Sequence, residues 1–256
     1  MGLGKTQAVV IGRRGLGESD RLVTFYSRRF GKIHGVARAA RRPRSRFGSA
    51  LEPFTLGDLV FFDTGRSDLL RIDHFDIVHP FSRAREDLER FAQGAWIIEC
   101  VGRLTADHDR HTALYGLLVR SLRGVETSAR PSRVAICFGV RCVDLLGHRP
   151  RLDACVGCGR PYPFARPHLD LDGGGLVCEG CEREASAGVP ISAVAVTGLE
   201  RLRSLRWEEA IRAPLGRGEA ELAAVLDAQV SRLIGQPTRT PRFVREVRRL
   251  SPGGRG

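Results

Sequence analysis

The 256-residue chain is long enough to bury a hydrophobic core, and its length favours two domains. A formal charge of +12 and a pI near 10.3 indicate an anionic partner such as nucleic acid. No apolar run approaches the roughly 20 residues of a membrane helix, and residues 1–12 lack the apolar core of a secretory signal, so we expect a soluble protein without a membrane partner. Seven cysteines without an export signal predict reduced thiols in the cytoplasm.

Short, alternating apolar patterns separated by glycines dominate the first 80 residues. They predict strands over residues 7–12, 21–30, 32–36, 55–62 and 69–78, with a glycine-rich turn at 13–20. Five short strands in so few residues indicate a small antiparallel barrel. We favour a DNA-binding OB-type barrel over residues 1–80, although five strands alone would also allow an SH3-like barrel.

Positive charge is concentrated between two of these strands, in residues 31–54. Five arginines fall within nine residues, and no Asp or Glu lies between Asp20 and Glu52. Such a cluster is typical of a polyanion-binding surface, although a short arginine-rich loop is also a common solvated surface. An aromatic side chain inside the cluster, Phe47, could stack on a base. The predicted DNA-binding residues are therefore Lys32, Arg38, Arg41, Arg42, Arg44, Arg46 and Phe47, and the surface could extend to Arg242, Arg245, Arg248 and Arg249.

The pattern changes to helical periodicity after Pro80, so we expect a mainly α-helical domain over residues 81–256. Thr197 and Glu200 have the spacing of a capping box at the start of one of its helices. Apolar stripes and turn residues predict helices over residues 82–104, 113–122, 131–147, 199–205, 219–234 and 242–250.

Four cysteines form the sharpest local motif, two Cys-x-x-Cys pairs separated by nineteen residues. Two such pairs can place four thiolates around one tetrahedral ion, so residues 155–181 predict a zinc-finger module within the helical domain. Four cysteine ligands leave no open coordination position, so we expect one structural zinc ion rather than a catalytic one. The predicted metal ligands are Cys155, Cys158, Cys178 and Cys181, whereas Cys100, Cys137 and Cys142 lie in apolar helical sequence and are expected to be buried.

The combination of motifs is more specific than any one of them. Residues 17–20 (GESD), 35–42 (GVARAARR), 45–47 (SRF) and 51–54 (LEPF) are followed in order by 145–159 (LLGHRPRLDACVGCG) and 172–181 (DGGGLVCEGC). Together these segments resemble the RecO family of bacterial DNA repair proteins. The resemblance covers most of the chain and is weakest after Pro190.

The resemblance implies an α+β fold, in which an N-terminal OB-type barrel precedes a mainly α-helical domain that carries a four-cysteine zinc-finger module. It implies a nucleoid-associated recombination mediator that binds single- and double-stranded DNA and anneals complementary strands. It also implies two protein partners: RecR, with which the protein would load recombinase onto coated single strands, and the acidic C-terminal tail of the single-strand-binding protein (SSB) that coats them.

Such a mediator is not an enzyme, but the residues alone leave two other classes open. A zinc-containing nuclease would need an open metal position or a cluster of carboxylates. An assembly protein would use its positive charge for an acidic protein partner instead of DNA.

Overall fold

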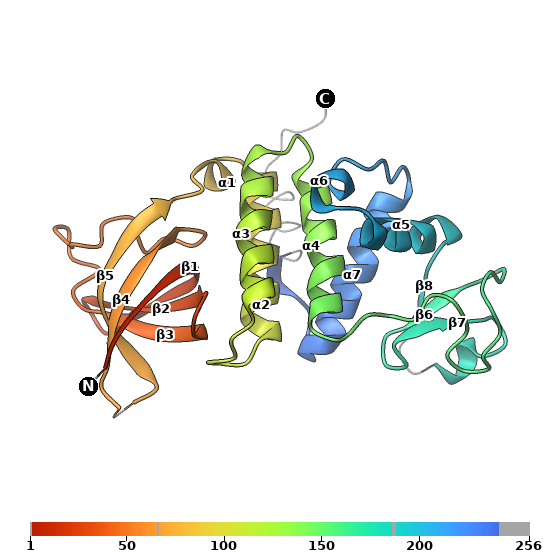
Figure 1. Ribbon diagram of the computed structural model, residues 1–256, viewed down its shortest axis with the longest axis horizontal. Helices are drawn as coiled ribbons and strands as arrows, with labels where there is room; N and C mark the ends of the chain where they lie inside the picture. Colours follow the sequence, from red (N-terminus) through yellow and green to blue (C-terminus); the bar gives the residue numbers. More distant parts are fainter. Residues whose placement is uncertain (1, 66, 186–187, 241–256) are drawn as a thin grey trace.

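The computed structural model describes residues 2–65, 67–185 and 188–240, which form three parts along the long axis of the molecule (Figure 1). A β-barrel lies at one end, a group of helices in the middle, and a small three-stranded sheet at the other end. The predicted α+β class is therefore confirmed. None of the described helices combines the length and the hydropathy needed to cross a membrane.

The barrel consists of β1 (Gly2–Leu16), β2 (Asp20–Ser27), β3 (Gly31–Ala37), β4 (Leu56–Asp63) and β5 (Leu69–His79). It closes in the order β1-β2-β3-β5-β4, the order of an OB-fold. Its paired strands are antiparallel except β3 and β5, which run parallel. In β3 every second residue is buried, so the period-two alternation of the sequence directly specifies which side chains enter the barrel core.

Strand β1 extends farther than the sequence predicts. The glycines at residues 13–20 favour a turn, but residues 13–16 continue the ladder with β2, and Arg13 lies opposite Val23. Only residues 17–19 form the turn, where Gly17 has a φ of 58° that few other residues adopt. Pairing with a neighbouring strand has outweighed the weak local preference of these glycines.

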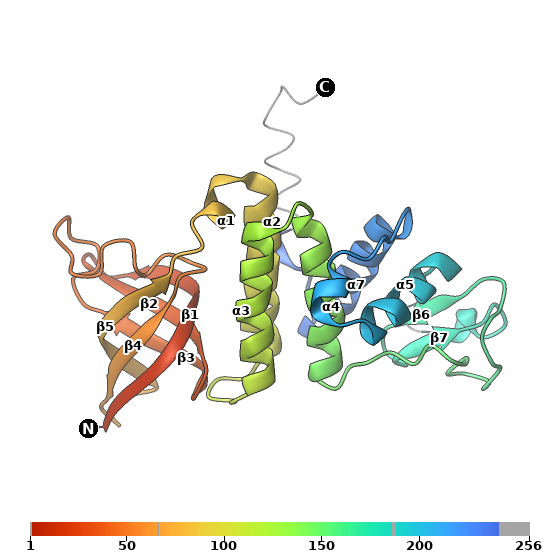
Figure 2. The same cartoon turned by 45° about the horizontal axis from the view of Figure 1, so that its top comes forward.

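The middle of the molecule is helical, as predicted. The α-helices within the described residues are α1 (Arg83–Glu86), α2 (Leu88–Leu104), α3 (Thr112–Thr127), α4 (Pro131–Leu145), α5 (Ala193–Ser204), α6 (Trp207–Ala210) and α7 (Gly218–Ile234). Helices α2, α3 and α4 pack side by side, and α7 packs against α4 (Figures 1 and 2). Their shared core buries Cys100, Cys137 and Cys142 as predicted, and burial raises the pKa of the Cys142 thiol to about 12.

The predicted capping box is wrong. Helix α5 begins at Ala193, and its cap is Ser192, whose hydroxyl oxygen accepts a hydrogen bond from the Ala195 amide at 3.2 Å. Thr197 and Glu200 lie inside the helix on its exposed side. Their spacing imitates a capping box, but the residue that caps the N-terminus of the helix is Ser192, five positions before Thr197. The helix predicted at 242–250 and the arginines at positions 242, 245, 248 and 249 lie outside the described residues.

The third part carries the four cysteines. Its sheet contains β6 (His168–Asp170), β7 (Gly175–Val177) and β8 (Gly188–Pro190) in the order β7-β6-β8, and a 3-10 turn at Glu182–Glu184 follows the second cysteine pair. Leu169, Leu176 and Val177 are buried in the same apolar core as the helices. The module is therefore packed against the helical part and shares its hydrophobic core.

Candidate nucleic-acid interface and metal centre

The arginine-rich segment is a loop that is fastened to the β1–β2 turn. It leaves β3 after Ala37 and lies against the turn, where the Arg41 amide donates to the Ser19 carbonyl at 2.9 Å. The Arg41 guanidinium also donates to the Gly17 carbonyl at 2.9 Å. These bonds hold the start of the loop to the hairpin, so both segments belong to one face of the barrel. We call residues 38–46 the arginine loop.

Asp20 anchors the same junction, a role that the sequence analysis did not assign to it. Its Oδ1 accepts hydrogen bonds from the Ala39 amide at 2.8 Å and from the Ser19 hydroxyl at 3.0 Å. These bonds, with Arg38 and Arg42 nearby, lower the pKa of the Asp20 carboxyl group. Ala39 has a φ of 55°, an uncommon conformation for a residue with a side chain, and the bond to Asp20 stabilises it there. No local sequence pattern reveals this contact, because it joins residues nineteen positions apart.

The five predicted arginines of the loop are all exposed. Within the described residues, no carboxylate lies within ion-pair distance of any of them. Their positive charges are therefore not neutralised by carboxylates in the described part of the protein, which favours contacts with phosphates from solution. They are Arg38, Arg41, Arg42, Arg44 and Arg46.

The structure places the other two predicted DNA-binding residues elsewhere. The Phe47 side chain is buried, with 4% of the residue exposed, and packs in the barrel core, while the Arg46 guanidinium covers its ring at 5.0 Å from the centroid. The Lys32 ammonium faces the helical part, where it donates to the Gly102 carbonyl at 2.9 Å and pairs with Asp107 at 3.1 Å. Both side chains are therefore engaged in contacts within the protein.

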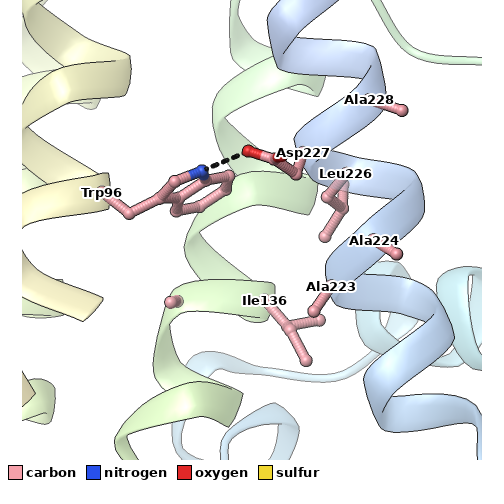
Figure 3. Close-up of a pocket in the computed structure, with 8 residues that line it drawn as sticks. Trp96, Ile136, Ala223, Ala224, Leu226, Asp227 and Ala228 are labelled. Carbon is pink, nitrogen blue, oxygen red and sulfur yellow. Dashed lines mark hydrogen bonds between the residues drawn. The ribbon is translucent and has the colours of Figure 1, made fainter. Parts of the chain in front are cut away.

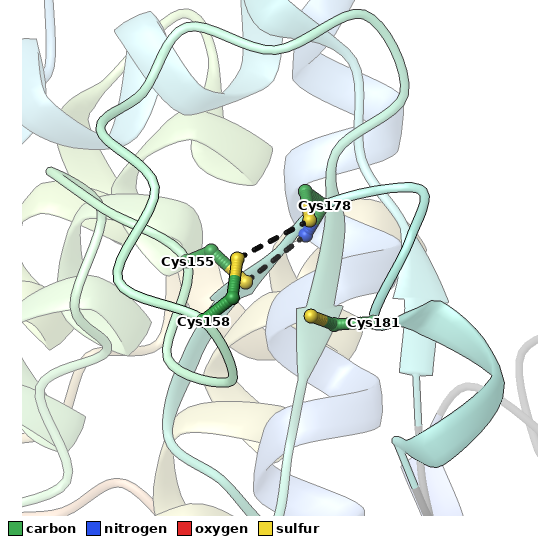
Figure 4. Close-up of side chains that lie close together, drawn as sticks. All are labelled: Cys155, Cys158, Cys178 and Cys181. Atoms are coloured by element: carbon green, nitrogen blue, oxygen red, sulfur yellow. Dashed lines mark hydrogen bonds between the residues drawn. The ribbon is translucent and has the colours of Figure 1, made fainter.

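The four cysteines of the predicted metal site come together (Figure 4). Their sulfur atoms all lie within 4.8 Å of one another, and those of Cys158 and Cys178 are 3.7 Å apart. A tetrahedral zinc ion with Zn–S bonds of about 2.3 Å requires sulfurs about 3.8 Å apart, so the cluster has the size of such a site. The described ligand set could therefore hold one metal ion.

The electrostatics of the cluster also favour a cation. Burial raises the pKa of Cys155, but hydrogen bonds from the backbone of Cys158, Cys178 and Gly157 outweigh this effect and lower it to about 6. The pKa of Cys181 is raised to about 12, chiefly by hydrogen bonds with Cys158 and Cys178. These opposite shifts belong to one coupled cluster, in which four sulfurs this close cannot all be thiolates unless a cation compensates them.

A hollow of about 380 Å³ lies between α2, α4 and α7 (Figure 3). Alanine, isoleucine and leucine side chains form most of its lining. The carboxylate that lines it, Asp227, accepts hydrogen bonds from the Trp96 indole at 3.0 Å and from the Thr238 hydroxyl at 2.5 Å. Because that carboxylate is already engaged and the described lining contains no second acid or base, the hollow lacks the groups of a hydrolytic site.

Comparison with known proteins identifies the family. Residues 1–81 match the family model described as "Recombination protein O N terminal", and residues 85–241 match "Recombination protein O C terminal". Proteins named "DNA repair protein RecO" are similar over nearly their whole length. The relative from Anaeromyxobacter dehalogenans (strain 2CP-C) is 35% identical over 97% of this chain and 98% of its own, and that from Geobacter sulfurreducens is 33% identical over 95% and 98%. The chain therefore belongs to the RecO family of DNA repair proteins.

Proposed function

We propose that this protein is a non-enzymatic recombination mediator that binds single- and double-stranded DNA and anneals complementary strands in bacterial DNA repair. The observation that carries the proposal is the set of five exposed arginines on a loop fastened to an OB-type barrel, which form no ion pair with any described carboxylate. Membership of a family of DNA repair proteins supports the same conclusion. We infer that it works on chromosomal DNA in the bacterial cytoplasm, in association with the nucleoid.

The arginine loop would bind DNA mainly through contacts between its guanidinium groups and the backbone phosphates. Because Phe47 is buried, the loop offers guanidinium groups and no aromatic stacking platform from its own residues. Guanidinium groups pair with phosphate oxygens and release counterions from the strand, independently of base sequence. Two complementary strands repel each other through these same phosphates, so a surface that neutralises both lowers the cost of bringing them together. Annealing by this route needs no nucleotide hydrolysis.

The test is the salt dependence of DNA binding in a variant carrying Arg41→Ala, Arg42→Ala and Arg44→Ala. Each phosphate contact to a single strand contributes about 0.7 to the slope of log K against log salt concentration, so losing three should flatten the slope by about 2. Fluorescence anisotropy with labelled oligonucleotides of unrelated sequence measures it. An unchanged slope would overturn the proposal.

A charge-matched control distinguishes the effect of the loop arginines from the effect of a lower net charge. Arg28, Arg123 and Arg217 are also exposed and lie outside the loop, on a barrel turn and beside or within helices of the middle part. Changing these three to Ala removes the same charge, and we expect it to leave the salt slope close to that of the wild type. Equal losses in both variants would show that binding follows overall charge and not the arginine loop.

We propose that the metal of the cysteine cluster is zinc and that its role is structural. All four ligands are supplied by the protein, so no position is left for water or substrate. The competing assignment, a zinc-containing nuclease, is tested by metal analysis together with incubation of labelled DNA. We expect one zinc ion per chain and intact DNA, whereas metal-stimulated cleavage would establish the nuclease.

We also propose RecR and the acidic C-terminal tail of SSB as protein partners. The family resemblance suggests both, and the net positive charge of the chain suits an acidic tail. With RecR, the protein would help load recombinase onto strands coated by SSB. An assembly protein that binds acidic partners but no DNA remains the alternative, and the salt-slope experiment distinguishes it, because such a protein would not bind the oligonucleotides.

A further inference from the structure

Beside the arginine loop, the end of the β1–β2 hairpin contains a hollow of about 320 Å³ that is lined by arginines. Its lining consists of Arg13, Arg14, Gly15, Arg21 and Arg41. Three of these arginines belong to β1 and β2, outside the arginine-rich segment that the sequence predicts to bind DNA. We call this feature the arginine hollow. It contains guanidinium groups and backbone, with no apolar side chain in its lining.

Two contacts place the arginine hollow against the arginine loop. Arg41 lines the hollow and also donates to the Gly17 carbonyl, so one side chain belongs to both features. Gly15 lies beside the same guanidinium group, since a β-carbon built there would be in ordinary contact with it, at 3.4 Å from Arg41 Nη1. The arginine hollow therefore continues the surface of the loop onto the hairpin. In OB-folds the loop between the first two strands is one of those that contact oligonucleotides.

The charges in the hollow are not balanced. Glu52 is the carboxylate that pairs there, at 2.5 Å from Arg13 and 3.7 Å from Arg21. Arg14 and Arg41 pair with no carboxylate among the described residues. Four arginines line the hollow, and one carboxylate is shared by two of them, so positive charge is in excess there and favours an additional anion. The side chains of Glu52, Arg13 and Arg21 are partly exposed, at 24–31%, so solvent ions can reach them.

Resting on the DNA-binding function proposed above, we propose that the arginine hollow binds a backbone phosphate of the nucleic acid. The phosphate competes with Glu52 for Arg13, so that Glu52 is an internal carboxylate that limits the affinity. A phosphodiester fits better than a base, because guanidinium groups recognise phosphate oxygens in pairs and the lining offers no surface for stacking.

Arg14→Ala is the most direct test, because Arg14 pairs with no described carboxylate and its removal exposes no partner. We expect weaker binding of labelled oligothymidine in fluorescence anisotropy and a salt slope lower by about 0.7, the contribution of one phosphate. Arg28→Ala is the matched control. Arg28 lies six residues beyond Leu22, the strand partner of Arg14, and therefore roughly 20 Å away. That variant should keep the slope of the wild type.

Glu52→Gln tests the competition in the opposite direction. Removing the carboxylate frees Arg13 and Arg21 for phosphate, so binding should become about two- to fivefold tighter, the range expected for one exposed ion pair. A purely structural role of Glu52 predicts unchanged or weaker binding instead. Circular dichroism shows whether the variant is folded, and if it is not, Arg14→Ala decides alone.

The outcomes separate this inference from the proposed function. The triple variant at Arg41, Arg42 and Arg44 could lose DNA binding while Arg14→Ala keeps the affinity and salt slope of the wild type. That result would overturn phosphate binding in the arginine hollow but would still support the DNA-binding function. A wild-type protein that binds no DNA would overturn both. If Arg14→Ala weakens binding of a glutamate-rich peptide but not of DNA, the hollow is a protein-binding site and the inference is wrong.

Discussion

Phe47 shows how a single buried ring shapes the arginine loop. It directly follows the loop, and its side chain is buried in the barrel core together with Ala50 and Leu51. The adjacent Arg46 covers the ring from outside. The ring therefore anchors the loop to the barrel, and the arginines that precede it remain on the surface. An anchor of this kind reduces the conformational entropy that the loop would otherwise lose when it binds a strand.

Phe47→Ala should therefore act on stability first. Removing a buried ring costs about 3–5 kcal/mol, because it leaves a cavity in the core. We expect a lower midpoint of thermal unfolding and weaker DNA binding through a loosened loop.

Phe47→Leu distinguishes the anchor from a stacking role. Leucine keeps an apolar side chain in the core, so we expect DNA affinity close to that of the wild type. If the ring instead left the core and stacked on a base, its loss would cost about 1–3 kcal/mol of binding free energy. A folded Phe47→Leu protein with such a loss in anisotropy would contradict the buried role.

Among the elements of the fold, we expect the cysteine module to depend on the proposed metal more than the barrel does. The module supplies Leu169, Leu176 and Val177 to the apolar core of the helices, and Cys155 and Cys178 are buried with them. The interior of the barrel, which includes Phe25, is a separate cluster, and the barrel contributes outer residues such as Tyr26 to the core of the helices. Loss of the metal should consequently disturb the cysteine module and the helices that it packs against, while the barrel and its arginine loop stay largely intact.

Cys178→Ser tests this separation. We expect the variant to lose its metal in elemental analysis and to unfold at lower temperature, because three thiolates and a hydroxyl bind zinc less well than four thiolates. Its affinity for single-stranded DNA should stay within about threefold of the wild type, a change below about 0.7 kcal/mol. Cys142→Ala is the control, since it removes a buried thiol outside the cluster and should keep the metal. Selective loss of DNA binding in a folded Cys178→Ser protein would argue against a structural role.

The elements that local patterns describe well were predictable from the sequence. The alternation of apolar and polar residues predicted the barrel strands, and apolar stripes with helical spacing predicted α2, α4 and α7. The spacing of the cysteines predicted the cluster that could hold a metal ion. The extension of β1, the Asp20 contact with Ala39 and the position of Lys32 were not predictable, because each depends on a partner distant in sequence. Charge alone made Lys32 look like a DNA ligand, but its ammonium group fastens the barrel to the helices.

On the scale of the whole molecule, the arginine loop and the cysteine module belong to opposite ends (Figure 2). Residues 1–81 carry a net charge of +6 and residues 155–185 a net charge of −2, so the positive potential that attracts DNA lies toward the barrel end. The helices between them offer a second surface. A hollow of about 540 Å³ lies between α3 and α4, with Leu117 and Leu145 in its lining and Arg120 exposed beside them.

The hollow between α3 and α4 combines apolar side chains with an exposed arginine, a chemistry that suits an acidic peptide. Arg120 is exposed and pairs with no described carboxylate, whereas the Arg141 guanidinium donates to the Leu205 carbonyl at 2.8 Å. The Asp144 carboxylate in the lining is neutralised by Arg203 at 2.9 Å and so repels an acidic peptide only weakly. We therefore propose this hollow, and not the arginine loop, as the binding site of the SSB tail.

If the two surfaces are separate, the protein should hold DNA and the SSB tail at the same time. Labelled tail peptide bound to the protein should keep its anisotropy when unlabelled oligothymidine is added to saturation. Arg120→Glu should weaken the peptide about tenfold, because a repulsive charge replaces an attractive one, and should leave the affinity for DNA nearly unchanged. Stoichiometric release of the peptide by DNA would show that the two surfaces overlap. In that case a mediator could exchange one ligand for the other but could not stay attached to SSB while it anneals the strands beside it.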